Sequence, residues 1–132
     1  MLEAGPDRVR IRAPLEPNRN HRSTAFGGSV GALAVLSGWT LVHLRLAGEG
    51  LRARTVIHES TIRYDAPIQG AFDAVCEAPP AASWTRFIRA LARRGKGRVR
   101  VRVAVTSGGR VAATFEGAYV ALAETARAGD AG

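Results

Sequence analysis

Residues 28–46 read GSVGALAVLSGWTLVHLRL, a long apolar stretch near the start of the 132-residue chain. Apolar side chains recur at the i, i+3, i+4 spacing of an α-helix, and further apolar side chains occupy its other side. Such a helix has to be buried on most of its sides. Gly38 costs about 1 kcal/mol of helix propensity relative to alanine, which close packing against another backbone would explain. Gly48 and Gly50 predict the end of the helix.

Strand-like runs precede and follow this helix. Arginine alternates with valine or isoleucine over residues 8–12 and 98–103, and valine recurs at every second position to residue 105, which predicts strands with one apolar face over 8–12 and 98–106. The pair Gly108-Gly109 predicts a tight hairpin turn after the second of these runs. The other three strands are expected over residues 55–64, 71–78 and 111–122, where β-forming residues are frequent.

A second, shorter helix is predicted over residues 83–94, with Ser83 as its N-cap and Gly95 just beyond its end. The order of elements is then strand, helix, two strands, helix and two strands. This order predicts an α+β domain in which a five-stranded, mostly antiparallel sheet wraps one long buried helix. We expect a single domain over residues 8–123, with flexible termini at 1–7 and 124–132.

Composition bounds the class of protein and its partners. The single cysteine, Cys76, excludes an intrachain disulfide and a CxxC metal or redox site. The formal net charge is +8, which fits an anionic partner or simply a solvated surface rich in arginine. Only eight residues are aromatic, and no helix-turn-helix or base-stacking motif is present. We therefore expect no nucleic-acid partner.

Residues 26–44 contain no acid, lysine or arginine and approach the length of a bilayer span. Their content of glycine, serine, threonine and histidine makes membrane insertion unfavourable, so we expect no membrane partner. The first 12 residues lack the apolar core of a signal peptide, and we expect a cytoplasmic protein. His21, His43 and His58 do not have the spacing of metal ligands, so no metal or other cofactor is expected.

The segment before the helix carries a more specific pattern. Residues 20–29 read NHRSTAFGGS. This resembles the loop-to-helix segment of hotdog-fold thioesterases, in which an asparagine precedes a Gly-Gly pair that opens the central helix. The sequence is more closely similar to the thioesterase domain that follows the acetyltransferase domain in bacterial YiiD-type proteins. Further matching stretches are APL (13–15), LSGW (36–39), VIHES (56–60), IRYDAP (62–67) and GKGR (95–98).

The resemblance covers about residues 13–122. It implies a hotdog fold, assembled as a homodimer or a dimer of dimers with sites at the subunit interface. It also implies an acyl-thioester substrate, on coenzyme A or on an acyl carrier, so that coenzyme A is part of the substrate rather than a cofactor. The residues do not fix the length or polarity of the acyl chain.

Thioester hydrolysis places negative charge on the carbonyl oxygen, and the first turn of a helix offers unpaired backbone N–H groups. Gly27 and Gly28 are the candidate oxyanion hole, because glycine lets a carbonyl approach the backbone closely. The same pair could simply form a tight helix start. Asn20 is a candidate to position water or the thioester, although loop asparagines also cap turns. Substrate contacts are predicted nearby at Thr24, Phe26 and Ser29.

A general base is harder to assign. Many hotdog thioesterases carry an acid on the central helix, but no acid lies between Ser29 and Ala47 here, and Val35 stands roughly where an aspartate is expected. YiiD-type domains typically show an acid at the position of Glu59, which is the candidate base, with Ser60 beside it as a substrate contact. Strand alternation would group Glu59 with Ile57, so only one of Glu59 and Ser60 can face the helix. An arginine of a neighbouring strand could instead pair with Glu59.

Residues 93–98 read RRGKGR. Cations and backbone N–H groups together suit phosphate, so Arg94, Lys96 and Arg98 are predicted to bind the coenzyme A phosphates. The resemblance places this region near the coenzyme A arm, although cations also suit a solvated helix end. Two functions follow: an acyl-thioester hydrolase, or a noncatalytic acyl-thioester or coenzyme A binder that has no need of a helix acid.

Overall fold

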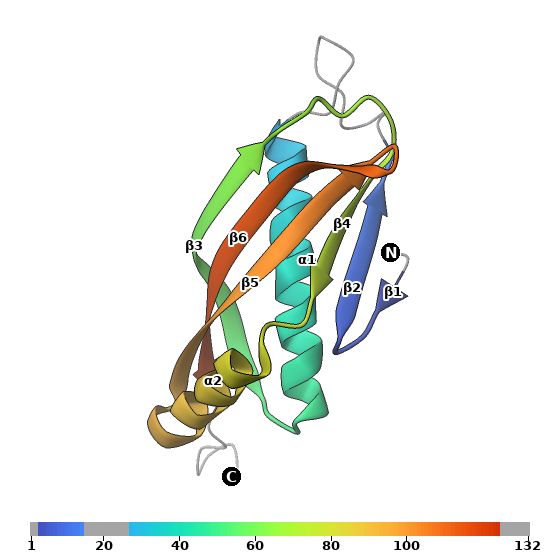
Figure 1. Cartoon of the computed structure of the whole chain (residues 1–132). Coiled ribbons are helices and arrows are strands. Elements are labelled where there is room, and N and C mark those ends of the chain that lie inside the picture. Colours follow the sequence, from blue (N-terminus) through green and yellow to red (C-terminus); the bar gives the residue numbers. More distant parts are fainter. Residues whose placement is uncertain (1–2, 15–26, 125–132) are drawn as a thin grey trace.

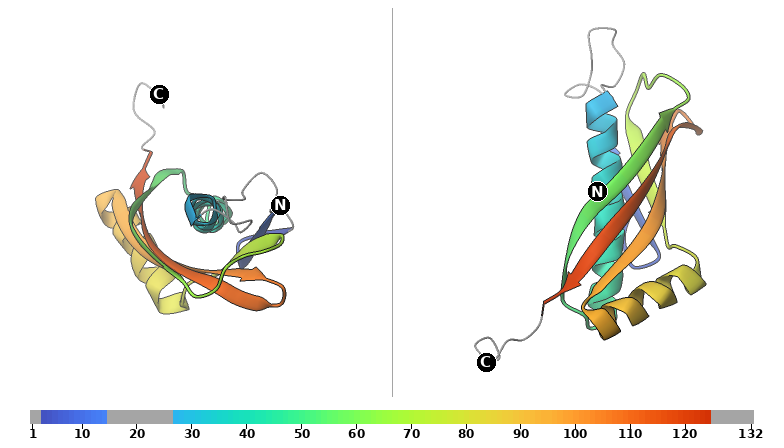
Figure 2. Two further views of the ribbon diagram at one scale, coloured as in Figure 1. Left: turned by 90° about the horizontal axis from the view of Figure 1, so that it is seen from above. Right: turned by 90° about the vertical axis from the view of Figure 1, so that its left-hand side faces the viewer.

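One long helix, α1 (Gly27–Gly48), lies in the concave face of a curved sheet (Figure 1, Figure 2). The computed structural model describes residues 3–14 and 27–124. A second helix, α2 (Ala81–Arg94), lies near the C-terminal end of α1. The strands are β1 (Glu3–Ala4), β2 (Arg8–Ala13), β3 (Ala53–Tyr64), β4 (Phe72–Glu77), β5 (Lys96–Ser107) and β6 (Arg110–Ala123).

The six strands form one sheet in the order β1-β2-β4-β5-β6-β3, and every neighbouring pair is antiparallel. The predicted α+β architecture, with one helix wrapped by an antiparallel sheet, is confirmed. The prediction of five strands misses β1, which pairs with β2 through Glu3 and Ala4. Two residues are too few for alternation to reveal a strand. Because β1 belongs to the sheet, the sheet begins before residue 8.

The inner face of the sheet supplies the core. On β5 the valines at 99, 101, 103 and 105 are buried, whereas the arginines between them are exposed. This is the alternation that the sequence predicts for a strand with one buried face. From α1, the fully or nearly fully buried side chains are Val30, Ala34, Ser37, Leu41, Val42 and Leu46.

The amphipathic helix α2 packs its buried side chains Trp84, Phe87 and Leu91 into the same core. The indole Nε1 of Trp84 donates a 2.7 Å hydrogen bond to Glu49, just beyond the end of α1. The predicted N-cap at Ser83 is wrong: α2 begins at Ala81 after Pro80, without a side-chain cap. Because the N-cap is Pro80, with a non-helical ψ of 141°, Ser83 lies inside the first turn of α2 and not before it. Gly95 ends α2 with a left-handed φ of 73°, as the sequence predicts.

Gly38 is packed against a tyrosine side chain rather than against another backbone. A Cβ atom at this position would lie 2.5 Å from the phenol oxygen of Tyr119. Tyr119 is fully buried, and its hydroxyl donates a 2.7 Å hydrogen bond to the carbonyl of Val35. Burial raises the pKa of this phenol, so it remains a donor at neutral pH. Tyr119 therefore occupies the space that a side chain at residue 38 would need.

We expect Gly38→Ala to destabilise the protein. Overpacking costs about 1–3 kcal/mol, which exceeds the gain of about 1 kcal/mol in helix propensity. Gly31→Ala is the matched control, because its Cβ would lie 3.8 Å from its nearest neighbour, at an ordinary contact distance. Urea unfolding should show a loss for Gly38→Ala and no loss for Gly31→Ala. Equal stability of the two variants would contradict this packing.

The sheet curves around α1 without enclosing it (Figure 2, left). Within the described residues, α1 is the one helix long and apolar enough in composition to cross a membrane. Only 39% of its most apolar window is buried, and Leu36 is 48% exposed. The side of α1 turned away from the sheet is therefore exposed among the residues that the structure describes.

Candidate active site

The N-terminal end of α1 offers the first candidate chemistry. The helix begins at Gly27, its first turn holds no acid, and Gly28 is exposed. Gly28 has no left-handed φ, so its backbone has the ordinary helical conformation. Ser29 is half-buried in the same turn. Because the first N–H groups of a helix lack partners within it, this end can stabilise a negative charge.

Three of the predicted site residues, Asn20, Thr24 and Phe26, lie outside the described residues. Val35, at the position where an aspartate is expected, is half-buried and packs against the core. Its carbonyl accepts the hydrogen bond from Tyr119. The described part of α1 thus presents backbone N–H groups and Ser29 at its start, but no acid.

A β-bulge sets the direction of Glu59. The register passes from Ile57 opposite Tyr119 to Glu59 opposite Ala118, so that His58 is an extra residue. Bulges of this kind re-aim the side chains that follow. The grouping of Glu59 with Ile57 that simple alternation predicts is therefore wrong. Ser60, which shares the strand face of the core residue Ile62, faces α1, and Glu59 faces the opposite side of the sheet.

On that outer face, a carboxylate oxygen of Glu59 lies 2.7 Å from the guanidinium of Arg98 on β5. The two side chains are 61% and 50% exposed, so solvent screens the pair. Glu59 thus forms an ion pair with an arginine of the sheet, which is the alternative to a catalytic role that the sequence left open. The sheet separates this pair from the helix within one protomer.

On the thioester substrate that the resemblance implies, we expect Glu59→Gln to leave any turnover within a few-fold of wild type. The substitution keeps the shape of the side chain, and loss of an exposed ion pair costs at most about 1 kcal/mol. Steady-state kinetics and thermal unfolding on the same preparation give both quantities. A loss of about 10² or more in kcat with an unchanged melting temperature would instead establish Glu59 as a general base.

The last residue of β3 brings a phenol to the start of α1, at the same end of the molecule (Figure 1). The hydroxyl oxygen of Tyr64 lies 3.8 Å from where a Cβ of residue 31 would be. The Tyr64 side chain is on the helix-facing side of β3, opposite the buried Ala113, yet the residue is 51% exposed. Sequence reasoning missed this residue, because nothing in IRYDAP shows that its tyrosine meets the helix start.

The predicted phosphate-binding residues lie at the other end of α1. Arg94 ends α2 and Lys96 begins β5, both exposed, and Trp84 ties α2 to the C-terminal end of α1. The 22 residues of α1 span about 33 Å at 1.5 Å per residue. Within one protomer, the basic run therefore does not meet Gly28.

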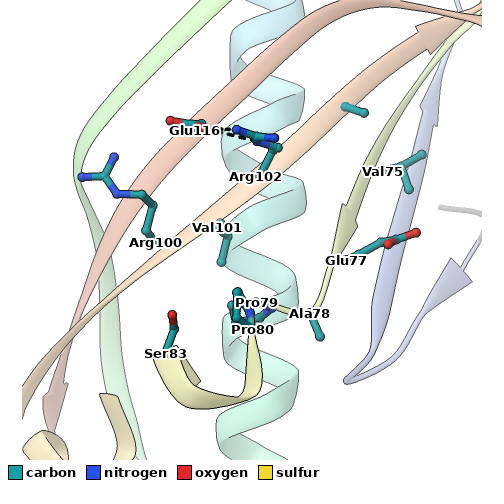
Figure 3. Close-up of a pocket in the computed structure, with 11 residues that line it drawn as sticks. Val75, Glu77, Ala78, Pro79, Pro80, Ser83, Arg100, Val101, Arg102 and Glu116 are labelled. Atoms are coloured by element: carbon teal, nitrogen blue, oxygen red, sulfur yellow. Dashed lines mark hydrogen bonds and ion pairs between the residues drawn. The ribbon is translucent and has the colours of Figure 1, made fainter. Parts of the chain in front are cut away.

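A groove of about 570 Å³ lies on the outer face of the sheet (Figure 3). Val75, Ala104 and Pro79 give it an apolar lining. Arg102 and Glu116 form a 2.6 Å ion pair at its side, and this hydrogen bond holds the pKa of the Glu116 carboxyl below its usual range. The groove lies on the side of the sheet away from α1, so it is not the site at the helix start.

Cys76 is unsuited to nucleophilic chemistry. The residue is fully buried between β4 and α1, and burial raises the pKa of its thiol to about 12. A thiol with so high a pKa is not ionised at neutral pH. Over residues 3–14 and 27–124, no three histidine, cysteine, aspartate or glutamate side chains gather where they could hold a metal ion.

A family model and several solved structures that resemble this chain are described as thioesterases. A family model described as "Putative thioesterase (yiiD_Cterm)" matches residues 3–123. A solved protein of unknown function from Chlorobaculum tepidum is 31% identical, with a TM-score of 0.85 over 89% of this chain and 78% of that one. A "putative thioesterase" from Shewanella oneidensis is 29% identical, with a TM-score of 0.80 over 92% and 81%. A Pseudomonas aeruginosa protein described as a "Probable Thioesterase" shares the fold at 24% identity, with a TM-score of 0.79 over 93% and 81%.

Proposed function

Because the chain belongs to the family of YiiD C-terminal thioesterases, we propose that it hydrolyses acyl thioesters at the N-terminal end of α1. The observation that carries this proposal is the helix start itself. Gly27 and Gly28 have no side chains of their own that could shield their backbone N–H groups, and Gly28 is exposed. A thioester carbonyl can approach such a turn closely.

In the proposed reaction, water adds to the carbonyl carbon, negative charge develops on the carbonyl oxygen, and the C–S bond then breaks. The N–H groups of the first turn and the positive end of the helix dipole stabilise that charge. The thiolate leaves and takes up the proton released by water. Asn20 is proposed to position the water, with Thr24, Phe26, Ser29 and Ser60 as substrate contacts around it.

We place the site in a homodimer formed through β3. This strand is 12 residues long and lies at the edge of the sheet, with one side bonded to β6 and the other left unpaired by the strands that the structure describes. Val56 is 43% exposed and Ile57 is 38% exposed on it. A long edge strand with exposed apolar residues is a template for pairing with a second chain, and pairing would also bring a partner over the exposed side of α1. Two such dimers could associate further into a dimer of dimers.

Antiparallel pairing of β3 with its copy about a two-fold axis turns one protomer end over end relative to the other. The basic run 93–98 of one protomer then comes to the same end of the dimer as Gly28 of its partner. An acyl-CoA could place its thioester at one helix start and its phosphates on Arg94 and Lys96 of the other protomer. Arg98 could join them, although it is paired with Glu59 in the single chain.

The test is a panel of acyl-CoA thioesters of increasing chain length, assayed for released thiol and for free acid. Hydrolysis predicts repeated turnovers per protomer, with thiol and acid formed in equal amounts. Saturable binding without turnover would instead select the noncatalytic acyl-thioester binder, for which the lack of an acid on α1 is sufficient reason.

A further inference from the structure

The groove on the outer face of the sheet exists because β4 leaves β5 early. The ladder between these strands ends at Cys76 opposite Val103, whereas β5 continues along β6 to Lys96. The chain after β4 is held towards the other edge of the sheet, since the N–H of Ala78 donates a 3.0 Å hydrogen bond to the carbonyl of Asp7. The two strands therefore separate, and the groove of about 570 Å³ lies where they part.

The size and lining of this groove suit a small molecule with an apolar body. Sites for small molecules typically measure about 300–1,000 Å³. Val75 and Ala104 are opposite each other in the ladder, and both are half-buried on the outer face. Ala78 and Pro79 extend this lining towards the start of α2. The groove thus offers a continuous apolar surface to a hydrocarbon chain.

The charges around the groove leave one cation without a partner. Arg102 and Glu116 neutralise each other in their 2.6 Å ion pair, and Glu77 lies 4.0 Å from the guanidinium of Arg8. Arg100 lies across the groove from Glu77 (Figure 3). With the residues that the structure describes it forms neither a hydrogen bond nor an ion pair, and it acts on the Glu116 carboxylate only from beyond ion-pair distance.

We propose that the groove binds an apolar monocarboxylic acid, with the hydrocarbon chain on the apolar lining and the carboxylate on the guanidinium of Arg100. A guanidinium can donate two parallel N–H bonds to one carboxylate. One negative charge matches the one unpaired cation, whereas the carboxylates of Glu77 and Glu116 would repel the double charge of a phosphate. The ligand class thus follows from the lining and from the charge together.

This site is separate from the start of α1. It lies between β4 and β5, and β6 separates both strands from the β3 edge, so pairing through β3 leaves the groove open. The acid released in the proposed hydrolysis belongs to the same chemical class. Binding in the groove does not depend on that reaction, because no bond is made or broken there.

The test is titration calorimetry of the full chain with octanoate, comparing two arginine variants. Arg100→Gln removes the proposed carboxylate partner. Arg110→Gln removes the same charge from an exposed residue at the start of β6 that does not line the groove. We expect the wild type and Arg110→Gln to bind one octanoate per chain with equal affinity. Arg100→Gln should bind about 10-fold more weakly or worse, the effect of losing a charge-assisted hydrogen bond.

Two further measurements separate the head group from the chain. Octanol, which has the same chain without the charge, should bind the wild type no better than octanoate binds Arg100→Gln. Ala104→Phe places a large ring in the groove from a half-buried position on the outer face, and it should abolish octanoate binding while circular dichroism stays unchanged.

The proposal is wrong if the wild type does not bind octanoate at millimolar concentration, or if both arginine variants bind it equally. Undiminished binding by a folded Ala104→Phe variant would also contradict it. None of these results requires thioester turnover, which is measured separately by thiol release. Failure of the proposed function therefore leaves this test intact, and failure of the groove as a site leaves the proposed function intact.

Discussion

Gly28→Val is expected to remove most of the thioester turnover and to leave the protein folded. The β-branched side chain would stand where the carbonyl approaches the first turn of α1. Losing access to an oxyanion donor typically costs about 10²–10³ in kcat. Valine is a better helix former than glycine, and Gly28 is exposed with an ordinary helical φ, so the fold should tolerate the change. Steady-state kinetics and circular dichroism on the purified variant measure the two effects.

Gly48→Val is the matched control at the opposite end of the same helix. A Cβ at residue 48 would meet nothing within 4 Å, and the proposed mechanism gives this end of α1 no reacting group. Turnover of Gly48→Val should stay within a few-fold of wild type. Equal turnover of the two variants, both folded, would exclude the helix start as the oxyanion hole.

Val56→Lys is expected to dissociate the dimer. Val56 is exposed on the unpaired edge of β3, and two-fold symmetry brings each substitution into the interface twice. Like charges at an interface cost several kcal/mol, which corresponds to an increase of roughly 10² or more in the dissociation constant. Sedimentation at micromolar concentration should show a dimer for the wild type and a 14.0 kDa monomer for the variant. Turnover should fall with the fraction of dimer.

Val111→Lys controls for the added charge. Val111 is 49% exposed on β6, where the β5–β6 hairpin begins its return, and lies away from the β3 edge. It should sediment as the wild type does. A wild-type protein that sediments only as a monomer would contradict assembly through β3, as would dissociation of both variants alike.

Much of the fold can be predicted from the sequence because it depends on local periodicity. The alternation of arginine and valine on β5 and the all-round apolar character of α1 both follow from which faces are buried. The strand β1 could not be found in this way because two residues carry no periodicity. Ser83 is predicted as the N-cap because the sequence pattern does not show that the helix already begins at Ala81, directly after Pro80.

The candidate site is less accessible to sequence reasoning because it depends on side-chain direction and on distance. The bulge at His58 places Glu59 on the opposite side of the sheet from the one that simple alternation predicts. A single extra residue cannot be recognised from the periodicity of the sequence. The approach of Tyr64 to Gly31 joins two elements that are far apart in the chain. The separation of Lys96 from Gly28 follows from the length of α1 and from the packing of α2. Local patterns determine none of these contacts.

The proposed site at the helix start is tested most directly by a crystal structure with a nonhydrolysable acyl-CoA in which the sulfur is replaced by a methylene group. This analogue keeps the carbonyl oxygen that the oxyanion hole would bind. We predict that oxygen within about 2.7–3.1 Å of a backbone N–H in the first turn of α1, at the interface of a dimer paired through β3. A carbonyl bound instead in the outer-face groove beside Arg102 and Glu116 would exclude the helix start as the site.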